Sequence, residues 1–247
     1  MKMRKKILLL QFRKKQKPLK QETEIFKKKM PGVKVMPFNT AKNHRRLANF
    51  PLENFNAIIM GGSGDFNLSD FKNKKKDPFW LMIKNTISFL KRVQKRKIPV
   101  LGICFGHQIL GYLLGSKVIH DAKQIEVGSF KLSLTKSGRK DPIFAGLPRS
   151  FTIQEGHKNS LEPLPKGARL LASTKNCPIS AFRYGKNIYG LQFHPELNKK
   201  DMLVRLMNYP KYLDLINVRK NKSLENFLKS SPETILILRN FLKLIGN

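Results

Sequence analysis

Cys104 lies between two glycines where an apolar run meets a helix-like run, in the segment Gly102-Ile-Cys-Phe-Gly106. A sharp turn from strand to helix strains the backbone of its central residue and leaves little room for side chains two positions away. The turn also exposes the sulfur at the carboxyl end of a sheet, near a helix N-terminus whose positive dipole end favours a thiolate. An arbitrary cysteine would more often be a small core residue. The flanking glycines instead favour a nucleophile.

A thiolate nucleophile needs a proton relay, and the chain contains five histidines. His194 closes the strand-like run Ile188–Phe193 and is followed by Pro195 and Glu196. A histidine and a carboxylate two residues apart at a strand end can reach the same side of the chain. The carboxylate then fixes the tautomer of the ring and stabilises its charged form. We therefore expect a catalytic set of Cys104, His194 and Glu196.

The elements that must position these residues follow from hydrophobic periodicity. Apolar residues at helical spacing predict a helix from Trp80 to Val93, and the run Phe105–Leu114 predicts another directly after the cysteine turn. Short apolar runs predict strands at Lys6–Phe12, Val33–Phe38, Ala57–Met60 and Pro99–Ile103. Strands that alternate with helices favour a mostly parallel sheet with helices on both faces, an α/β fold.

The second half of the chain has a different pattern. From Lys117 to Phe193, strand-like pieces are separated by turns such as Ser137-Gly138 and Tyr184-Gly185, which predicts an antiparallel extension of the sheet. The segment 199–247 is expected to be helical, with elements at Leu224–Leu228 and Thr234–Ile245. Without internal repeats or a long linker rich in Pro, Gly and Ser, residues 1–247 are expected to form a single domain.

Composition limits the classes of protein and of partner. The chain has 247 residues, of which 40% are hydrophobic, which excludes a disordered chain and a stapled mini-protein. Forty-nine Lys and Arg against 16 Asp and Glu give a formal charge of +33, so an electropositive surface is expected. The basic clusters are dispersed along the chain, which makes nucleic-acid binding possible but does not favour it; they are Arg4–Lys6, Arg13–Lys17, Lys27–Lys29, Lys72–Lys76 and Lys95–Lys97.

Cysteine content and apolar run length bear on the compartment. Two cysteines, Cys104 and Cys177, are too few for a disulfide framework and are compatible with a reducing, cytoplasmic environment. No stretch approaches the roughly 18 apolar residues of a membrane span. We therefore expect a cytoplasmic protein without a membrane partner.

Two segments together carry a family resemblance. Gly102–Gln108 and Gly190–Glu196 resemble the paired signature of the class I glutamine amidotransferases, in the customary order and at the customary separation. Gly61–Gly64 occupies the position of that family's oxyanion-loop glycines, and Glu155–Ser160 that of its substrate-contacting histidine segment. Further phrases resemble stand-alone members similar to the amidotransferase part of GMP synthase, at Glu126–Ser129, Lys140–Pro148 and Leu238–Leu242. The resemblance implies a flavodoxin-like fold.

The resemblance also implies a mechanism with L-glutamine as substrate. Cys104 would attack the side-chain carboxamide and form a γ-glutamyl thioester, which water then converts to glutamate. His194 would relay protons to the departing ammonia, and Glu196 would orient His194. Backbone N–H groups of Gly62 and Phe105 would stabilise the negative charge that develops on the amide oxygen.

Four further residues are candidate substrate contacts by the same resemblance: Gly64, Gln108, His157 and Lys158. Without this resemblance, Gln108 would be interpreted as a helix glutamine that faces solvent. His157 is expected to have a structural role more than a catalytic one. Lys158 and Asn159 stand where GMP synthases commonly have Gly-Asp. Because this loop helps to bind the substrate, the resemblance defines the reaction at Cys104 better than it defines the substrate specificity.

No cofactor and no metal are expected. The chain lacks the phosphate-loop and dinucleotide-binding patterns, and Gly61–Asp65 does not have the residue order of an ATP pyrophosphatase loop. His44, His107 and His120 have no metal-ligand spacing with an acidic or cysteine partner. The ammonia would therefore be delivered to an acceptor domain or synthetase on another chain.

One competing motif interpretation is argued against by the residue order, and two alternative functions remain. The cysteine turn also fits the nucleophile elbow of an α/β hydrolase, but the acidic residue of that triad precedes its histidine, whereas Glu196 follows His194. The same triad could hydrolyse γ-glutamyl peptides, which requires a pocket open to a bulky leaving amine. A protein of another class, a basic scaffold that binds nucleic acid or an acidic partner, is the second alternative function.

Overall fold

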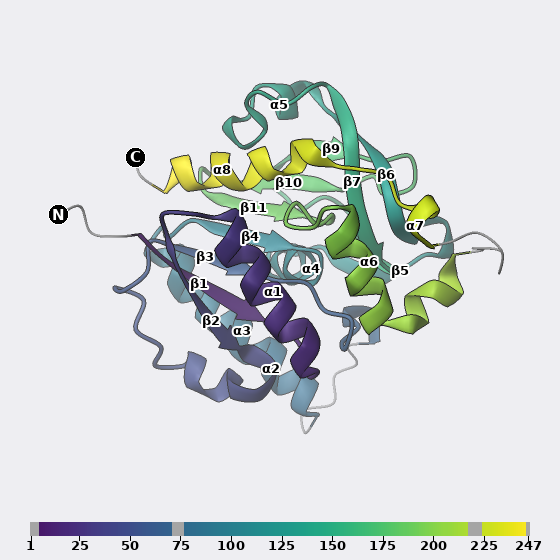
Figure 1. The fold of residues 1–247 in the computed structure, drawn as a ribbon. Helices are drawn as coiled ribbons and strands as arrows, with labels where there is room; N and C mark the ends of the chain where they lie inside the picture. Colours follow the sequence, from purple (N-terminus) through teal and green to yellow (C-terminus); the bar gives the residue numbers. More distant parts are fainter. Residues whose placement is uncertain (1–4, 71–76, 217–223, 246–247) are drawn as a thin grey trace.

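A mixed sheet forms the centre of the computed structural model, which describes residues 5–70, 77–216 and 224–245 (Figure 1). Within these residues nine strands pair in the order β2-β1-β3-β4-β11-β10-β9-β6-β7. Their bounds are β1 (Lys6–Gln11), β2 (Lys34–Asn39), β3 (Ala57–Met60), β4 (Val100–Ile103), β6 (Glu126–Leu134), β7 (Ser150–His157), β9 (Ala168–Ser173), β10 (Ala181–Tyr184) and β11 (Ile188–Leu191).

One half of the sheet, from β2 to β11, is parallel throughout. Counting β11 as the fifth strand, its order is the 2-1-3-4-5 order of flavodoxin-like folds. In β1, Ile7 and Leu9 belong to the hydrophobic core on one face, and Leu8 and Leu10 to the core on the other. Burial on both faces explains why the central strands β3 and β4 are continuous apolar runs in the sequence, whereas the edge strand β2 is buried only at Val35 and Phe38.

Helices cover both faces of the parallel half, as the sequence predicted (Figure 1). The helices α1 (Gln16–Lys29) and α8 (Ile235–Leu244) contribute Phe26 and Phe241 to the core that holds Ile7. On the opposite face, α3 (Pro78–Lys95) and α4 (Phe105–Leu113) contribute buried residues to the core that holds Leu8. The sheet is thereby enclosed between two helical layers.

The other half, from β10 to β7, is antiparallel, and the expected extension is confirmed. A separate antiparallel pair joins β5 (Lys117–His120) to β8 (Asn159–Glu162). The remaining α-helices are α2 (Thr40–Asn43), α5 (Lys136–Arg139), α6 (Lys199–Asn208) and α7 (Leu224–Phe227). Segments of 3-10 helix lie at His44–Leu47, Leu68–Asp70, Ala122–Gln124, Pro142–Phe144, Pro210–Leu215 and Pro232–Thr234.

The structure corrects several details of the sequence analysis. Predicted boundaries differ by one residue at one end in β1, β4, α4 and α7, by one residue at both ends in β2 and α8, and by two residues at both ends in α3. The pair Ser137-Gly138 lies in the helical turn α5. The basic cluster Arg13–Lys17 does not lie wholly on the surface, because Arg13 is buried against α1. The cluster Lys72–Lys76 lies outside the described residues. Among the described helices, none has the length and apolar character needed to cross a membrane.

Candidate active site

Cys104 lies at the junction of β4 and α4 with a backbone φ of 52°, in the left-handed region that non-glycine residues rarely adopt. Its N–H donates to the carbonyl of Leu191 at 2.8 Å, which ties the turn to β11. A Cβ added to Gly102 would lie 2.6 Å from the carbonyl oxygen of Gly106, and one added to Gly106 would lie 2.5 Å from that of Met60. Both glycines are therefore required by close backbone approaches, as predicted.

His194 and Glu196 form a buried pair just beyond β11. Nδ1 of His194 lies 2.7 Å from Oε1 of Glu196. The N–H of His194 donates to the carbonyl of Gln154 on β7, and Lys29 of α1 donates to the carbonyl of Glu196. The pair is thus held by both halves of the sheet and by a covering helix.

Opposing effects set the pKa values of this pair. Burial by itself lowers the pKa of His194, but the Glu196 carboxylate and the Cys104 side chain outweigh it and raise the pKa to about 9. Burial would raise the pKa of Glu196, but the adjacent His194 lowers it below its ordinary value. The imidazolium and the carboxylate therefore stabilise each other.

Gly62, in the loop after β3, lies against both the cysteine and the histidine. A Cβ added to it would lie 2.8 Å from Cε1 of His194 and 3.4 Å from Cβ of Cys104. Within the described part of the chain, the N–H groups of Gly62 and Phe105 donate no hydrogen bond. Two free amide donors therefore accompany the sulfur, one on the glycine loop and one on the residue after Cys104.

The candidate substrate contacts all line one pocket together with Cys104: Gly64, Gln108, His157 and Lys158. Gln108 is buried rather than solvent-facing, and its Nε2 donates to the carbonyl of Asn159 at 2.9 Å and to Oε1 of Gln192 at 3.2 Å. The Nζ of Lys158 lies 5.1 Å from the centre of the Tyr212 ring. The structure therefore brings together every candidate that the sequence singled out.

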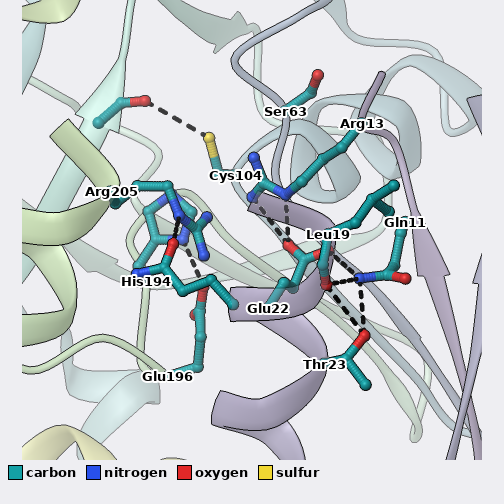
Figure 2. Close-up of polar contacts among 12 residues, drawn as sticks. Gln11, Arg13, Leu19, Glu22, Thr23, Ser63, Cys104, His194, Glu196 and Arg205 are labelled. Atoms are coloured by element: carbon teal, nitrogen blue, oxygen red, sulfur yellow. Dashed lines mark hydrogen bonds and ion pairs between the residues drawn. The ribbon is translucent and has the colours of Figure 1, made fainter. Parts of the chain in front are cut away.

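Arginine side chains beside the histidine were missed by the sequence analysis (Figure 2). Arg13 forms a buried ion pair with Glu22 of α1 at 2.8 Å. Arg205 of α6 donates from Nε to Gln21, and its positive charge lowers the pKa of Glu196. Burial in turn lowers the pKa of Arg205 to about 10. Both arginines lie in lysine-rich or mixed segments without a motif, so the sequence carried no signal for their burial.

A second buried histidine near the nucleophile, His157, lies at the end of β7. Sγ of Cys104 lies 3.8 Å from the carbonyl oxygen of Gly156, the residue between Glu155 and His157. Nε2 of His157 lies 3.5 Å from Oε2 of Glu126 and 3.6 Å from Oε2 of Glu155. Burial, together with the neighbouring Glu126, raises the pKa of Glu155 well above its ordinary value.

The other histidines and the second cysteine do not join the candidate set. His44 contacts Asn85 on α3, and His120 lies 3.3 Å from the side-chain oxygen of Asn159. Burial lowers the pKa of His107 to about 3, so this ring is neutral in the core. Burial raises the pKa of the Cys177 thiol, which makes it a poor nucleophile.

Comparison with known proteins identifies similar chains. Residues 23–208 match the model of the family glutamine amidotransferase class-I. The chain is 32% identical over 153 residues to a glutamine-hydrolysing GMP synthase subunit of Thermococcus kodakarensis, covering 60% of this chain and 72% of that relative. It is 34% identical over 169 residues to the glutamine-hydrolysing GMP synthase of Borreliella burgdorferi, covering 68% of this chain and 29% of the relative. The chain spans about a fifth to a third of the length of such long relatives.

Solved structures support the fold. A glutamine amidotransferase from Thermotoga maritima superposes with a TM-score of 0.75 at 21% identity, over 99% of this chain and all of that one. A glutamine amidotransferase from Methylobacillus flagellatus superposes with a TM-score of 0.63 at 15% identity, over 98% of this chain and 91% of that one. At these identities the likeness establishes the shared architecture alone.

Proposed function

Because the chain belongs to the class I glutamine amidotransferases, a family of glutamine-hydrolysing enzymes, we propose that it hydrolyses L-glutamine with Cys104, His194 and Glu196. The observation that carries this proposal is the buried 2.7 Å pair of His194 and Glu196 beside a cysteine held at a strained turn. A cysteine beside an imidazole whose charged form is stabilised is activated as a thiolate.

The first half-reaction forms a covalent intermediate. The Cys104 proton passes to His194, and the thiolate attacks the side-chain carboxamide carbon of glutamine, forming a C–S bond. The tetrahedral intermediate collapses as the C–N bond breaks, and His194 gives its proton to the departing nitrogen, which leaves as ammonia. The product at this stage is a γ-glutamyl thioester.

The second half-reaction regenerates the thiol. His194 removes a proton from water, which attacks the thioester carbon, and the C–S bond then breaks to release glutamate. Glu196 keeps the ring of His194 in the tautomer that presents Nε2 to the reacting atoms, because its carboxylate accepts a hydrogen bond from Nδ1. One histidine therefore serves as base and acid in both halves.

The free amides of Gly62 and Phe105 are suited to an oxyanion hole. They have no acceptor within the described residues, and they belong to the loop and turn that adjoin Cys104. Donors that are fixed in advance stabilise the developing negative charge without reorganisation, and losing one typically costs about 10²-fold or more in rate.

The pocket around Cys104 is the proposed site of the amino-acid end of glutamine. Gly64 and Gln108 form part of its wall, and the hydrogen bonds of Gln108 to Asn159 and Gln192 fix that wall in place. Lys158 supplies a positive charge at the pocket that suits the α-carboxylate of the substrate.

We propose that the ammonia is used by a synthetase or acceptor domain on another chain. The relative from Thermococcus kodakarensis is named as one subunit of a GMP synthase, and the long GMP synthases extend well beyond the length that this chain matches. A GMP-synthase-like partner is therefore the first to test. We also propose that residues 1–247 form a single amidotransferase domain.

Glutamate release from L-glutamine tests the activity directly. The wild-type chain should turn over glutamine, and Cys104→Ala should abolish turnover while the circular dichroism spectrum is retained. A glutamine-mimicking electrophile should modify Cys104 and spare Cys177, because burial raises the pKa of the Cys177 thiol. Turnover that survives in Cys104→Ala would contradict the proposal, and equal labelling of both cysteines would contradict the activation of Cys104.

A further inference from the structure

Three buried side chains outside the proposed triad meet between β6 and β7. Glu126, Glu155 and His157 each offer one ligand atom, and these atoms lie within 4.8 Å of one another. In the antiparallel register Glu126 is the direct partner of His157, and Glu155, two residues before His157, lies on the same face of β7. All three side chains are at most 1% exposed.

The hydrogen bonds around this cluster leave unshared electron pairs facing one another. Nδ1 of His157 lies 3.0 Å from the carbonyl oxygen of Asn159, which only accepts, so Nδ1 carries the proton and Nε2 presents its lone pair. Oε1 of Glu126 accepts from the hydroxyl of Thr174 at 2.6 Å, which fixes that carboxylate. Neither oxygen of Glu155 accepts a hydrogen bond from any described residue.

The distances within the cluster fit a coordinated ion better than hydrogen bonds. Nε2 of His157 lies 3.5 and 3.6 Å from the two carboxylate oxygens, beyond the roughly 2.7–3.2 Å of ordinary N–H···O bonds. Nitrogen and oxygen ligands about 2.1 Å from a tetrahedral Zn²⁺ are separated by about 3.4 Å. The two measured separations therefore match the distances between ligand atoms around a tetrahedral Zn²⁺.

We propose that Glu126, Glu155 and His157 bind a divalent transition metal, for which Zn²⁺ is the best fit. An imidazole and two carboxylates are ligands that Zn²⁺ accepts, and two carboxylates neutralise its charge in a buried site. The carbonyl of Asn159 and the hydroxyl of Thr174 are outer partners that orient the ligands.

The proposed ion would support the active site without taking part in the reaction. It would join β6 to β7 through residues on both sides of Gly156, whose carbonyl faces Sγ of Cys104. The site needs no assumption about glutamine hydrolysis. Its test is therefore based on metal binding and not on turnover.

The experiment uses the full chain with the Cys104→Ala substitution, because the thiolate and His194 could bind Zn²⁺ themselves. The protein is freed of metal by dialysis against a chelator, incubated with ZnCl2, and measured by calorimetry and by elemental analysis after gel filtration. We expect one Zn²⁺ per chain. Adding Glu155→Gln should weaken binding by at least about tenfold, whereas adding Glu162→Gln, at an exposed carboxylate on β8, should leave it unchanged.

A measurement with Co²⁺ keeps the proposal testable if the cluster variants do not fold. Co²⁺ bound to Cys104→Ala should give the intense visible absorption of a tetrahedral site with nitrogen and oxygen ligands. If Glu155→Gln does not fold, Glu126→Gln replaces it in the comparison, and the Co²⁺ spectrum of Cys104→Ala decides on its own. No Zn²⁺ uptake by Cys104→Ala, an octahedral Co²⁺ spectrum, or equal affinity in a folded cluster variant would overturn the proposal.

Discussion

Two buried histidines near Cys104 have carboxylate neighbours, yet their surroundings differ. His194 faces one carboxylate at 2.7 Å, within hydrogen-bond distance. His157 faces two, at 3.5 and 3.6 Å, and its other nitrogen is held by a backbone carbonyl. The first arrangement stabilises a proton on the ring, whereas the second leaves acceptors facing one another. Residue types alone therefore do not determine what a histidine does.

The largest difference between His194 and His157 should appear in the turnover of glutamine. His194→Ala removes the only proposed proton relay and should lower kcat by about 10³-fold or more. His157→Gln leaves the relay in place and changes the wall of the substrate pocket, so we expect a smaller effect that falls mainly on KM. Steady-state glutaminase kinetics of both variants measure the contrast. A kcat loss in His157→Gln as large as in His194→Ala would show that the two histidines share the chemistry.

Glu196→Gln should have the next largest effect. The amide keeps the size of the side chain but removes the negative charge that stabilises the imidazolium, so kcat should fall by about 10²-fold or more without disappearing. Glu162→Gln, an exposed change of the same type, is the matched control. Turnover equal to that of this control would remove Glu196 from the triad.

The pair of His194 and Glu196 should also make folding stability depend on pH. The pKa of His194 is raised from 6.5 to about 9, so its contribution is complete below pH 6.5 and is lost as the pH rises through about 9. The lowered pKa of Glu196 gives a contribution that is complete above pH 4.5 and is lost as the pH falls below that. The stabilisation is therefore greatest between pH 4.5 and 6.5.

Denaturant unfolding of the wild type and His194→Gln measures this contribution. The difference in unfolding free energy should reach at most roughly 3 kcal/mol at pH 5.5 and shrink by pH 9.5. A difference that stays constant across this range would mean that His194 is not held as an imidazolium in the folded protein.

The smallest expected effect is on the pH dependence of folding stability, where buried Glu155 should be destabilising while the pair of His194 and Glu196 is stabilising. Because burial raises its pKa, the wild type should lose stability as the pH rises above 4.5, where the unfolded chain ionises this carboxyl more readily. Glu155→Gln removes that penalty, so its stability relative to wild type should increase from pH 5 to pH 8 when a chelator is present. Denaturant unfolding at several pH values tests the sign, and the opposite trend would show that Glu155 is stabilised as a carboxylate.

The grouping of Cys104, His194 and Glu196 could be predicted from the sequence because each of its two signals is local, although the two meet only through the pairing of β4 with β11. The two glycines flanking Cys104 and the spacing of His194 and Glu196 are each contained in a short segment. The same holds for three of the parallel strands, in which Ile7–Leu10, Ala57–Met60 and Val100–Ile103 are buried apolar runs. The family resemblance added the roles of the glycine loop, which spacing alone did not give.

The His157 cluster could not be predicted in this way, because it depends on pairing between distant strands. Glu126 and His157 are 31 positions apart and meet only through the register of β6 and β7. Helix α1 was missed for a related reason, since its buried face contains Glu22 between Leu19 and Phe26 and so lacks an apolar period. That glutamate neutralises Arg13, a contact that a single sequence does not reveal.

The pairing of β4 with β11 has a consequence for folding. Gly102 is the direct partner of Gly190, so the cysteine and histidine come together only after the intervening chain, including the antiparallel half of the sheet, has been closed into a loop. Contacts between such distant segments form late, because the entropy of loop closure must be overcome first. During refolding, secondary structure should therefore recover before glutamine turnover, because turnover requires β4 and β11 to be paired.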